Sequence, residues 1–202
     1  MRARVAVLAA AFLVAGSSAA PAQGPGDPTT VFADGLGAAC RMAFDSVGNL
    51  LVASLNTGEI WSIDPAGGVT LFTDQVPDPR WVSFDAFGWP LVTSHTNAMV
   101  HRISPQGEVT EFAPVDGGVG IVTDQDGSVW VAAVDTLWHF DAMGRVLEAI
   151  ETLDTYGIAA RGIYPAPNGS LYLTGSAGAL WRLVDGVPEQ LQGVHPYRWW
   201  GL

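Results

Sequence analysis

A module of about 40 residues occurs four times in this 202-residue chain. Its turn glycines, Gly48, Gly88, Gly127 and Gly169, follow one another at spacings of 40, 39 and 42 residues. Each module contains four short apolar segments bounded by Gly, Asp, Asn or Pro, a pattern that predicts successive antiparallel strands. A repeat of this length made of four strands is typical of a propeller blade. The sequence therefore predicts an all-β fold, a β-propeller with four complete four-stranded antiparallel blades.

The register of the repeat defines the expected strands. Inner strands are predicted over residues 42–44, 82–84, 121–123 and 163–165, and second strands over 50–54, 90–94, 129–133 and 171–175. Third strands are predicted over 60–63, 100–103, 137–140 and 180–183. Fourth strands are predicted over 69–72, 109–112 and 146–150, with a weak one near 190–191. The blades then cover about residues 42–73, 82–113, 121–151 and 163–192.

Both ends of the repeat region carry partial modules. Residues 30–34 resemble the fourth-strand segments, so we expect a closing outer strand that has no blade of its own. Residues 200–202 match the start of an inner strand and so begin a further blade. Closure of a propeller removes exposed sheet edges, which otherwise favour association. We therefore expect a propeller over residues 30–202 that is truncated, or else a natural half-ring that closes by dimerisation.

The N-terminus has the features of a cleavable signal peptide. Arg2 and Arg4 precede an apolar run over residues 5–15, and the triplet 20–22 is an A-x-A cleavage site. We expect a signal peptide over residues 1–22, which holds nearly all the helix, and a Gly- and Pro-rich linker over 23–29. The mature protein is then secreted or periplasmic and is not membrane-bound.

Charge and cysteine content exclude several classes of function. The net charge is −11, and all nine basic residues are arginines. Sequence-independent nucleic-acid binding and attachment to anionic membranes both require clustered cations, so neither is expected. Cys40 is the single cysteine, which excludes an intramolecular disulfide, and we expect it as a buried or half-buried thiol.

Two segments carry a family resemblance. Residues 42–72 read MAFDSVGNLLVASLNTGEIWSIDPAGGVTLF, and residues 100–112 read VHRISPQGEVTEF. Over residues 30–202 the repeat resembles the secreted propeller superfamily of NHL-repeat, gluconolactonase (senescence-marker) and streptogramin-lyase-like proteins. Members usually have six or seven blades, so the resemblance also favours truncation.

The resemblance implies two enzymatic activities as an alternative to simple ligand binding, namely a metal-dependent lactonase and a streptogramin-type lyase. The lactonase family holds a central metal with Glu, Asn and Asp, and its early Glu-Gly-Pro-x-Trp segment is matched only by Asp-Pro-Arg-Trp at residues 78–81. The lyases carry their catalytic His and Glu in later blades. A divalent cation is therefore implied for the full-length protein only, and no metal site or catalytic residue is predicted in this chain.

Several repeated polar and aromatic residues are interpreted as structural. Asp45, Asp85 and Asp124 each precede a turn glycine by three residues, where a carboxylate accepts hydrogen bonds from the turn backbone. Trp61, Trp138 and Trp181 share one third-strand position with His101, which indicates packing between blades. His139 is expected at the surface or at an interface.

The positions where inner strands begin are the predicted ligand site. Loops that lead into inner strands surround one mouth of a propeller channel, and arginines and aromatic residues gather there. The predicted ligand-binding residues are Arg41, Arg80, Trp81, Arg161, Tyr197, Arg198 and Trp200. Arginine binds carboxylate or phosphate through two parallel hydrogen bonds, so the mouth is expected to bind an anionic or carbonyl-bearing small molecule. The alternatives are that each arginine pairs with a loop acid such as Asp78 or Asp154, and that the chain is an interaction module.

Overall fold

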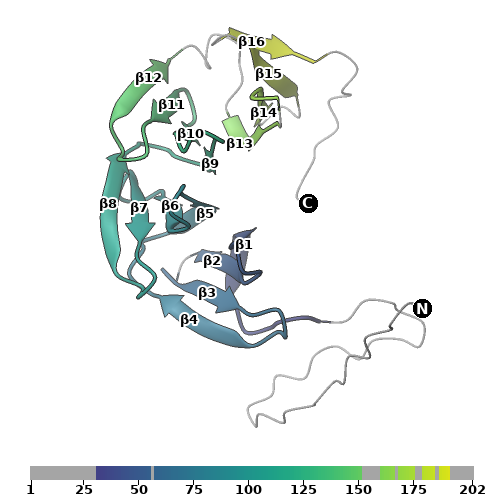
Figure 1. Ribbon diagram of the computed structural model, residues 1–202, viewed down its shortest axis with the longest axis vertical. Coiled ribbons are helices and arrows are strands. Elements are labelled where there is room, and N and C mark those ends of the chain that lie inside the picture. The colour runs from purple at the N-terminus through teal and green to yellow at the C-terminus, as the bar shows by residue number, and fades with distance from the viewer. Residues whose placement is uncertain are drawn as a thin grey trace, which may run out of the picture. The chain divides into compact units, whose positions relative to one another are not determined.

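Four antiparallel sheets of four strands each form the part of the chain that the structure describes (Figure 1). The computed structural model describes residues 31–55, 57–151, 160–166, 168–175, 179–184 and 187–191, with the backbone but not the side chain of Arg161. The chain divides into two units, residues 1–32 and 33–202, and every described strand belongs to the second.

Each sheet contains four strands that are consecutive in the sequence, as in a propeller blade. Blade 1 contains β1 (Ala38–Phe44), β2 (Leu50–Leu55), β3 (Ile60–Ile63) and β4 (Val69–Thr73). Blade 2 contains β5 (Pro79–Phe84), β6 (Pro90–Ser94), β7 (Met99–Ile103) and β8 (Val109–Pro114). Blade 3 contains β9 (Gly120–Thr123), β10 (Val129–Ala132), β11 (Leu137–Phe140) and β12 (Val146–Ile150). Blade 4 contains β13 (Ala160–Pro165), β14 (Leu171–Gly175), β15 (Leu180–Val184) and β16 (Val187–Gln190).

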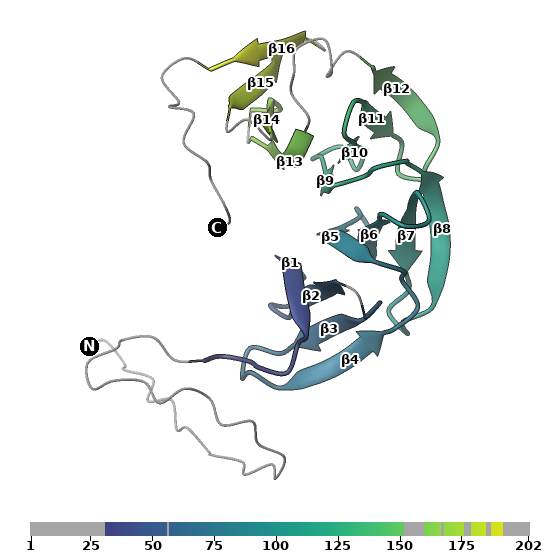
Figure 2. The same ribbon diagram turned by 180° about the vertical axis from the view of Figure 1, so that it is seen from behind.

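The predicted propeller fold is confirmed, and the blades follow one another around an arc (Figures 1 and 2). Strands β1, β5, β9 and β13 lie on the inner side of the arc, and β4, β8, β12 and β16 lie on its outer side. Three of the inner strands begin three or four residues earlier than predicted. In each of these three a register shift interrupts the alternation of side chains near the start, so the apolar pattern did not reveal the extension.

One strand prediction at the end of the repeat needs correction, and one at its start is not observed. The last fourth strand is β16 and ends at Gln190, whereas the prediction was 190–191, because β15 pairs with Val187 onward. Residues 31–36 lie in no strand, so the closing strand predicted over 30–34 is not observed in the described part of that segment. A strand requires a partner, and none of the four sheets has a fifth member among the described residues. The signal segment and the blade start at 200–202 lie outside the described residues.

Carboxylates hold the turn between the first two strands, as predicted. Asp45 Oδ1 accepts the backbone N–H groups of Val47 and Asn49, and Asp85 Oδ1 does the same for Phe87 and Trp89, at 2.8–2.9 Å. In blade 3 the role is divided, because Asp124 accepts from Gln125 and Asp126 accepts from Ser128. The glycine that closes each turn has a positive φ, from 79° to 93°, which side chains disfavour.

The hydrophobic cores lie between neighbouring blades. Among the described residues, three buried clusters join blades 1 and 2, blades 2 and 3, and blades 3 and 4. Trp138 packs against the second cluster and Trp181 against the third, which confirms their predicted role between blades. His101, the member of this position in blade 2, is buried, and its Nε2 lies 2.9 Å from Asn97 Nδ2. Cys40 is a free, half-buried thiol.

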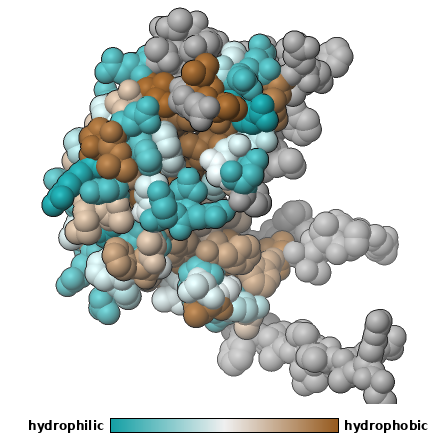
Figure 3. All heavy atoms as spheres, turned by 45° about the horizontal axis from the view of Figure 1, so that its top comes forward, coloured by the Kyte–Doolittle hydropathy of each residue, from teal (hydrophilic) through white to brown (hydrophobic). Residues whose placement is uncertain are grey.

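The face of blade 1 that points away from blade 2 is apolar and partly open. Met42 and Phe44 are 58% and 70% exposed, and Val69 and Leu71 on the same face are also exposed. On the face shown in Figure 3, apolar and polar side chains are interspersed. No helix among the described residues is long and apolar enough to cross a bilayer.

Candidate functional site

The loops that precede the inner strands meet the β6–β7 and β10–β11 loops at one end of the blades. His95 N–H donates to the Asp78 carbonyl at 3.3 Å, and Val115 N–H donates to the Ala98 carbonyl at 2.9 Å. Asp78 and Ala98 have φ values of 43° and 51°, a left-handed conformation that is costly for residues other than glycine. We call this the loop end, and its strained backbone is held by hydrogen bonds between the β6–β7 loop and the loops that lead into β5 and β9.

Three side chains from different blades meet at the inner strands near the loop end. The Arg41 guanidinium carbon of β1 lies 4.6 Å from the centroid of the Trp81 ring of β5, a cation–π contact. The Trp81 and Tyr164 rings meet edge to face, with centroids 6.0 Å apart and planes at 66°. The Trp81 backbone N–H donates to Thr93 Oγ1 at 3.1 Å, which fixes the strand that carries the indole. We call Arg41, Trp81 and Tyr164 the inner-strand cluster.

Glycine in blades 3 and 4 permits this contact between blades 2 and 4. Gly120 and Gly162 occupy the position that holds Arg41 in blade 1 and Trp81 in blade 2. A Cβ on Gly120 would lie 3.1 Å from Ile163 Cγ2, and one on Gly162 would lie 3.0 Å from the Tyr164 ring. The absence of side chains at both positions lets β9 approach β13 closely and leaves room for the Trp81 and Tyr164 rings.

The two predicted arginines with described side chains have different partners. Arg80 pairs with Asp78 at 3.0 Å, which is the local pairing that the alternative interpretation expected. Arg41 forms no ion pair with any carboxylate in the described part of the chain. Arg161 contributes its backbone to β13, and its side chain lies outside the description. The predicted site residues Tyr197, Arg198 and Trp200 also lie outside the described residues.

Sequence reasoning did not include Tyr164 in the site. In the repeat its position is occupied by Ala43, Ser83 and Val122, so a tyrosine there is the one large polar aromatic side chain at that position. Tyr164 lies two residues after Gly162, the counterpart of Trp81, and residues two apart in a strand face the same side of the sheet. This alternation, together with the residue size at each position of the repeat, could have placed Tyr164 beside the predicted residues.

Described residues line cavities between neighbouring blades. One, of about 370 Å³, opens at the loop end between blades 2 and 3 and is lined by His95, Asp116, Gly117, Val134, Asp135, Thr136 and Trp138. Thr136 Oγ1 donates to Asp135 Oδ1 at 3.1 Å in its wall. Within the ranges described, no three His, Cys, Asp or Glu side chains are grouped closely enough to hold a metal ion.

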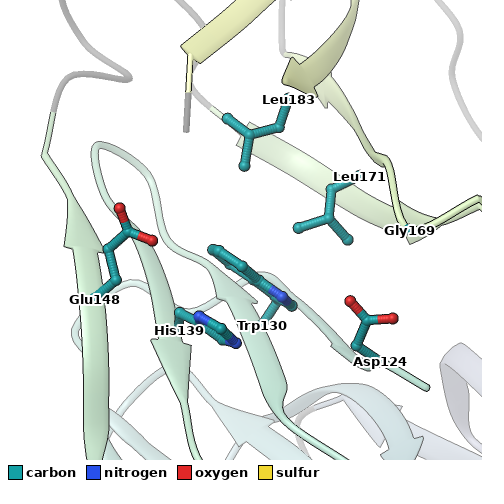
Figure 4. Close-up of a pocket in the computed structure, with 7 residues that line it drawn as sticks. All are labelled: Asp124, Trp130, His139, Glu148, Gly169, Leu171 and Leu183. Atoms are coloured by element: carbon teal, nitrogen blue, oxygen red, sulfur yellow. The ribbon is translucent and has the colours of Figure 1, made fainter. Parts of the chain in front are cut away.

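The second cavity, of about 330 Å³, lies between blades 3 and 4 and is lined by Asp124, Trp130, His139, Glu148, Gly169, Leu171 and Leu183 (Figure 4). The His139 ring stacks on Trp130 with centroids 3.8 Å apart and planes at 6°. Burial lowers the pKa of His139 below its ordinary value, and the charges of Asp126, Glu148 and Asp124 oppose that effect. The predicted interface role of His139 is therefore observed, and the residue also faces a cavity.

Comparison with solved structures places the fold among known β-propellers. A catalytically inactive virginiamycin B lyase from Staphylococcus aureus, solved with quinupristin, is 19% identical, with 75% of this chain and 54% of the lyase aligned and a TM-score of 0.66. A gluconolactonase-like protein is 19% identical over 74% of this chain and 57% of its own, with a TM-score of 0.59. An auxiliary nutrient-binding protein from Bacteroides ovatus is 19% identical, with 78% of this chain and 42% of that protein aligned and a TM-score of 0.65.

The chain thus spans about half the length of these structures. The resemblance to streptogramin-lyase-like and gluconolactonase-like propellers is confirmed for the fold, which is what identity of this level establishes. No protein-family model and no curated protein matches the sequence.

Proposed function

We propose that this protein binds a small carboxylate- or carbonyl-bearing molecule at the inner-strand cluster. The observation that carries the proposal is that the Arg41 guanidinium lies on an aromatic ring without a carboxylate partner among the described residues. This guanidinium lies on the Trp81 ring at 4.6 Å and is not neutralised by a carboxylate of the described residues. A guanidinium held on an aromatic face keeps its edge donors free for an acceptor, and the planar fork suits a carboxylate.

The neighbouring groups favour a flat ligand. Trp81 and Tyr164 supply two aromatic walls from different blades, and edge-to-face packing holds them in fixed relative orientation. Arg80 is a weaker candidate than the sequence indicated, because Asp78 already occupies its guanidinium at 3.0 Å. Among the proteins of similar fold, one was solved with quinupristin and another is described as nutrient-binding, which supports a small-molecule role.

Calorimetric titration of the purified protein with benzoate, succinate and inorganic phosphate tests this function. We expect a carboxylate probe to bind, with benzoate favoured by the aromatic walls, and to bind roughly tenfold to a hundredfold more weakly to Arg41→Ala, since a charge-assisted hydrogen bond contributes about 1.5–3 kcal/mol. Arg145→Ala is the matched control, because it removes an equal charge from an exposed turn of blade 3. Equal affinity of wild type and Arg41→Ala, or no binding of any probe, would count against the cluster as the site.

The alternative function is catalysis in a longer protein, as a metal-dependent lactonase or a streptogramin-type lyase. It is favoured by the similar folds of a lyase and a gluconolactonase-like protein. The lactonase alternative is tested by an assay of δ-lactone hydrolysis by the full-length protein, with and without added divalent cations. Metal-dependent turnover that is lost in Trp81→Ala but retained in Arg145→Ala would favour catalysis over simple binding.

We further propose that the protein is secreted or periplasmic. The support is the sequence of residues 1–22, with two arginines, an apolar run and an A-x-A site. Mass spectrometry of the protein from the extracytoplasmic fraction is expected to find a mature N-terminus at Gln23. Recovery of the chain only in the cytoplasm with its first residues intact would refute the proposal.

A further inference from the structure

One polar position of the third strand recurs in all four blades, and in blades 1 to 3 it lies on the face toward the following blade. It pairs with the second residue of the second strand, and it holds Ser62 in blade 1, Arg102 in blade 2, His139 in blade 3 and Arg182 in blade 4. We call it the slot position, because in blades 2 and 3 its side chain lies at the space between its own blade and the next. The repeat therefore allows the contents of neighbouring slots to be compared directly.

Between blades 2 and 3 the slot is filled by a guanidinium. Arg102 Nε lies 2.9 Å from Asp85 Oδ2, and the Asp85 side chain is completely buried. Arg102 Nη2 donates to the Ala142 carbonyl of blade 3 at 2.6 Å, and the guanidinium carbon lies 4.8 Å from the Phe112 ring centroid. The cation is thus balanced by an ion pair with Asp85, a hydrogen bond to Ala142 and an aromatic face, although the Nε–Oδ2 contact does not have hydrogen-bond geometry.

The slot between blades 3 and 4 also has a carboxylate and an aromatic ring in its walls, but its slot residue is a histidine, which is shorter than arginine. Asp124 is the repeat counterpart of Asp85, and His139 replaces Arg102. The imidazole lies flat on Trp130 and does not span the gap to blade 4, so the cavity of about 330 Å³ remains. The Nε2 atom of His139 is buried and has no hydrogen-bond partner among the described residues.

The cavity walls have complementary chemistry on opposite sides. Figure 4 shows the stacked Trp130 and His139 between Glu148 on one side and Asp124 on the other. Leu171 and Leu183 of blade 4 form the facing wall (Figure 4). Two carboxylates attract a cation, an indole face stabilises it further, and the leucines accept an alkyl chain. A volume of this size is at the lower end of the range for small-molecule sites.

We propose that this cavity binds a small organic cation with a guanidinium or amine group, which occupies the place that the Arg102 guanidinium occupies between blades 2 and 3. Asp124 and Glu148 lie on opposite sides of the stacked rings, so each can hold a charged group, while the indole supports the cation and the leucine wall contacts the alkyl chain. This site is separate from the inner-strand cluster and does not depend on the function proposed for that cluster.

Calorimetric titration of the whole chain with agmatine, which carries a guanidinium and an amine on a four-carbon chain, tests the proposal. Wild type is expected to bind agmatine, and an excess of succinate, which carries no cation, should not displace agmatine from this cavity. Glu148→Gln should weaken agmatine binding by about tenfold or more, because it removes a charge-assisted contact. Glu111→Gln, which removes the same charge from the fourth strand of blade 2, should bind as wild type does. Absence of agmatine binding to wild type, or equal losses in the two variants, would overturn the proposal.

His139→Arg provides an independent test, because it restores the arginine of the preceding slot and lets the chain fill its own cavity. We expect this variant to lose agmatine binding while its circular dichroism spectrum stays that of wild type. Agmatine binding that persists in folded His139→Arg would overturn the proposal. If this variant does not fold, the comparison of Glu148→Gln with Glu111→Gln decides.

Discussion

Removal of the Arg102 side chain should reveal how much one slot contributes to the stability of the propeller. Arg102→Ala leaves the Asp85 carboxylate in place, and that carboxylate has no exposed surface, while the Arg102 side chain is only 15% exposed. Breaking a buried ion pair by removal of one partner costs about 3–5 kcal/mol, because the other charge stays buried without compensation. The hydrogen bond to Ala142 and the contact with Phe112 are lost at the same time.

We expect a loss of about 3 kcal/mol, the lower end of that range, since the vacated slot can admit water to Asp85. For a domain of this size such a loss lowers the melting temperature by roughly 6–12 °C. Urea unfolding followed by circular dichroism gives the free-energy change, provided that the slope of the transition is preserved. The double variant Asp85→Asn, Arg102→Met should be less destabilised than Arg102→Ala, because no charge is then left unpaired.

Arg182→Ala is the matched control, since Arg182 holds the slot position in blade 4. Its partner is Glu189 at 2.8 Å, but the two side chains are 40% and 53% exposed. Exposed pairs contribute little to stability, so this variant should unfold with the wild-type midpoint. If Arg102→Ala is no less stable than Arg182→Ala, burial of the Asp85–Arg102 pair is not what makes that contact important.

Other perturbations test different parts of the structure. Gly120→Ala should lower the free energy of unfolding by about 1–3 kcal/mol, because the added Cβ overpacks against the next inner strand. Gly118→Ala is the control: its added Cβ has ordinary contacts of 3.4–3.6 Å, so urea unfolding should be nearly unchanged. Burial lowers the pKa of His101 and of His139, so the unfolded chain binds more protons than the folded one near pH 6. The free energy of unfolding should therefore fall as pH drops from about 7 to about 5. Replacement of both histidines by Gln should flatten this dependence in unfolding curves measured across pH. Phe44 is 70% exposed on the open face of blade 1, so the protein should self-associate in sedimentation experiments. Phe44→Lys should reduce that association. A monodisperse wild-type monomer would contradict this prediction.

The repeat made most of the fold predictable, because turns and strands depend on local residue types. The roles of Asp45 and Asp85 in their turns, and of Trp138 and Trp181 between blades, were predicted from position alone and are observed. These residues act within a blade or against its immediate neighbour, so one module is enough to specify them.

The candidate sites were less predictable, because they depend on residues that differ between modules. Tyr164 meets Trp81 across an intervening blade, and this requires glycine at position 120. The cavity beside His139 likewise results from a difference in side-chain length from Arg102. Both sites are departures from the repeat, whereas the sequence analysis relied on what the modules share.

The location of the cores between blades has a consequence for how the protein unfolds and how its length can change. Since the described clusters each join two modules, a module removed from its neighbours has little core of its own. Stability is then approximately a sum over interfaces between nearest neighbours, as in a one-dimensional array. Amide exchange should be fastest in blades 1 and 4, each of which has one such interface among the described residues, and slowest in blades 2 and 3. Duplication or loss of one whole module would change the number of interfaces by one and leave the others intact.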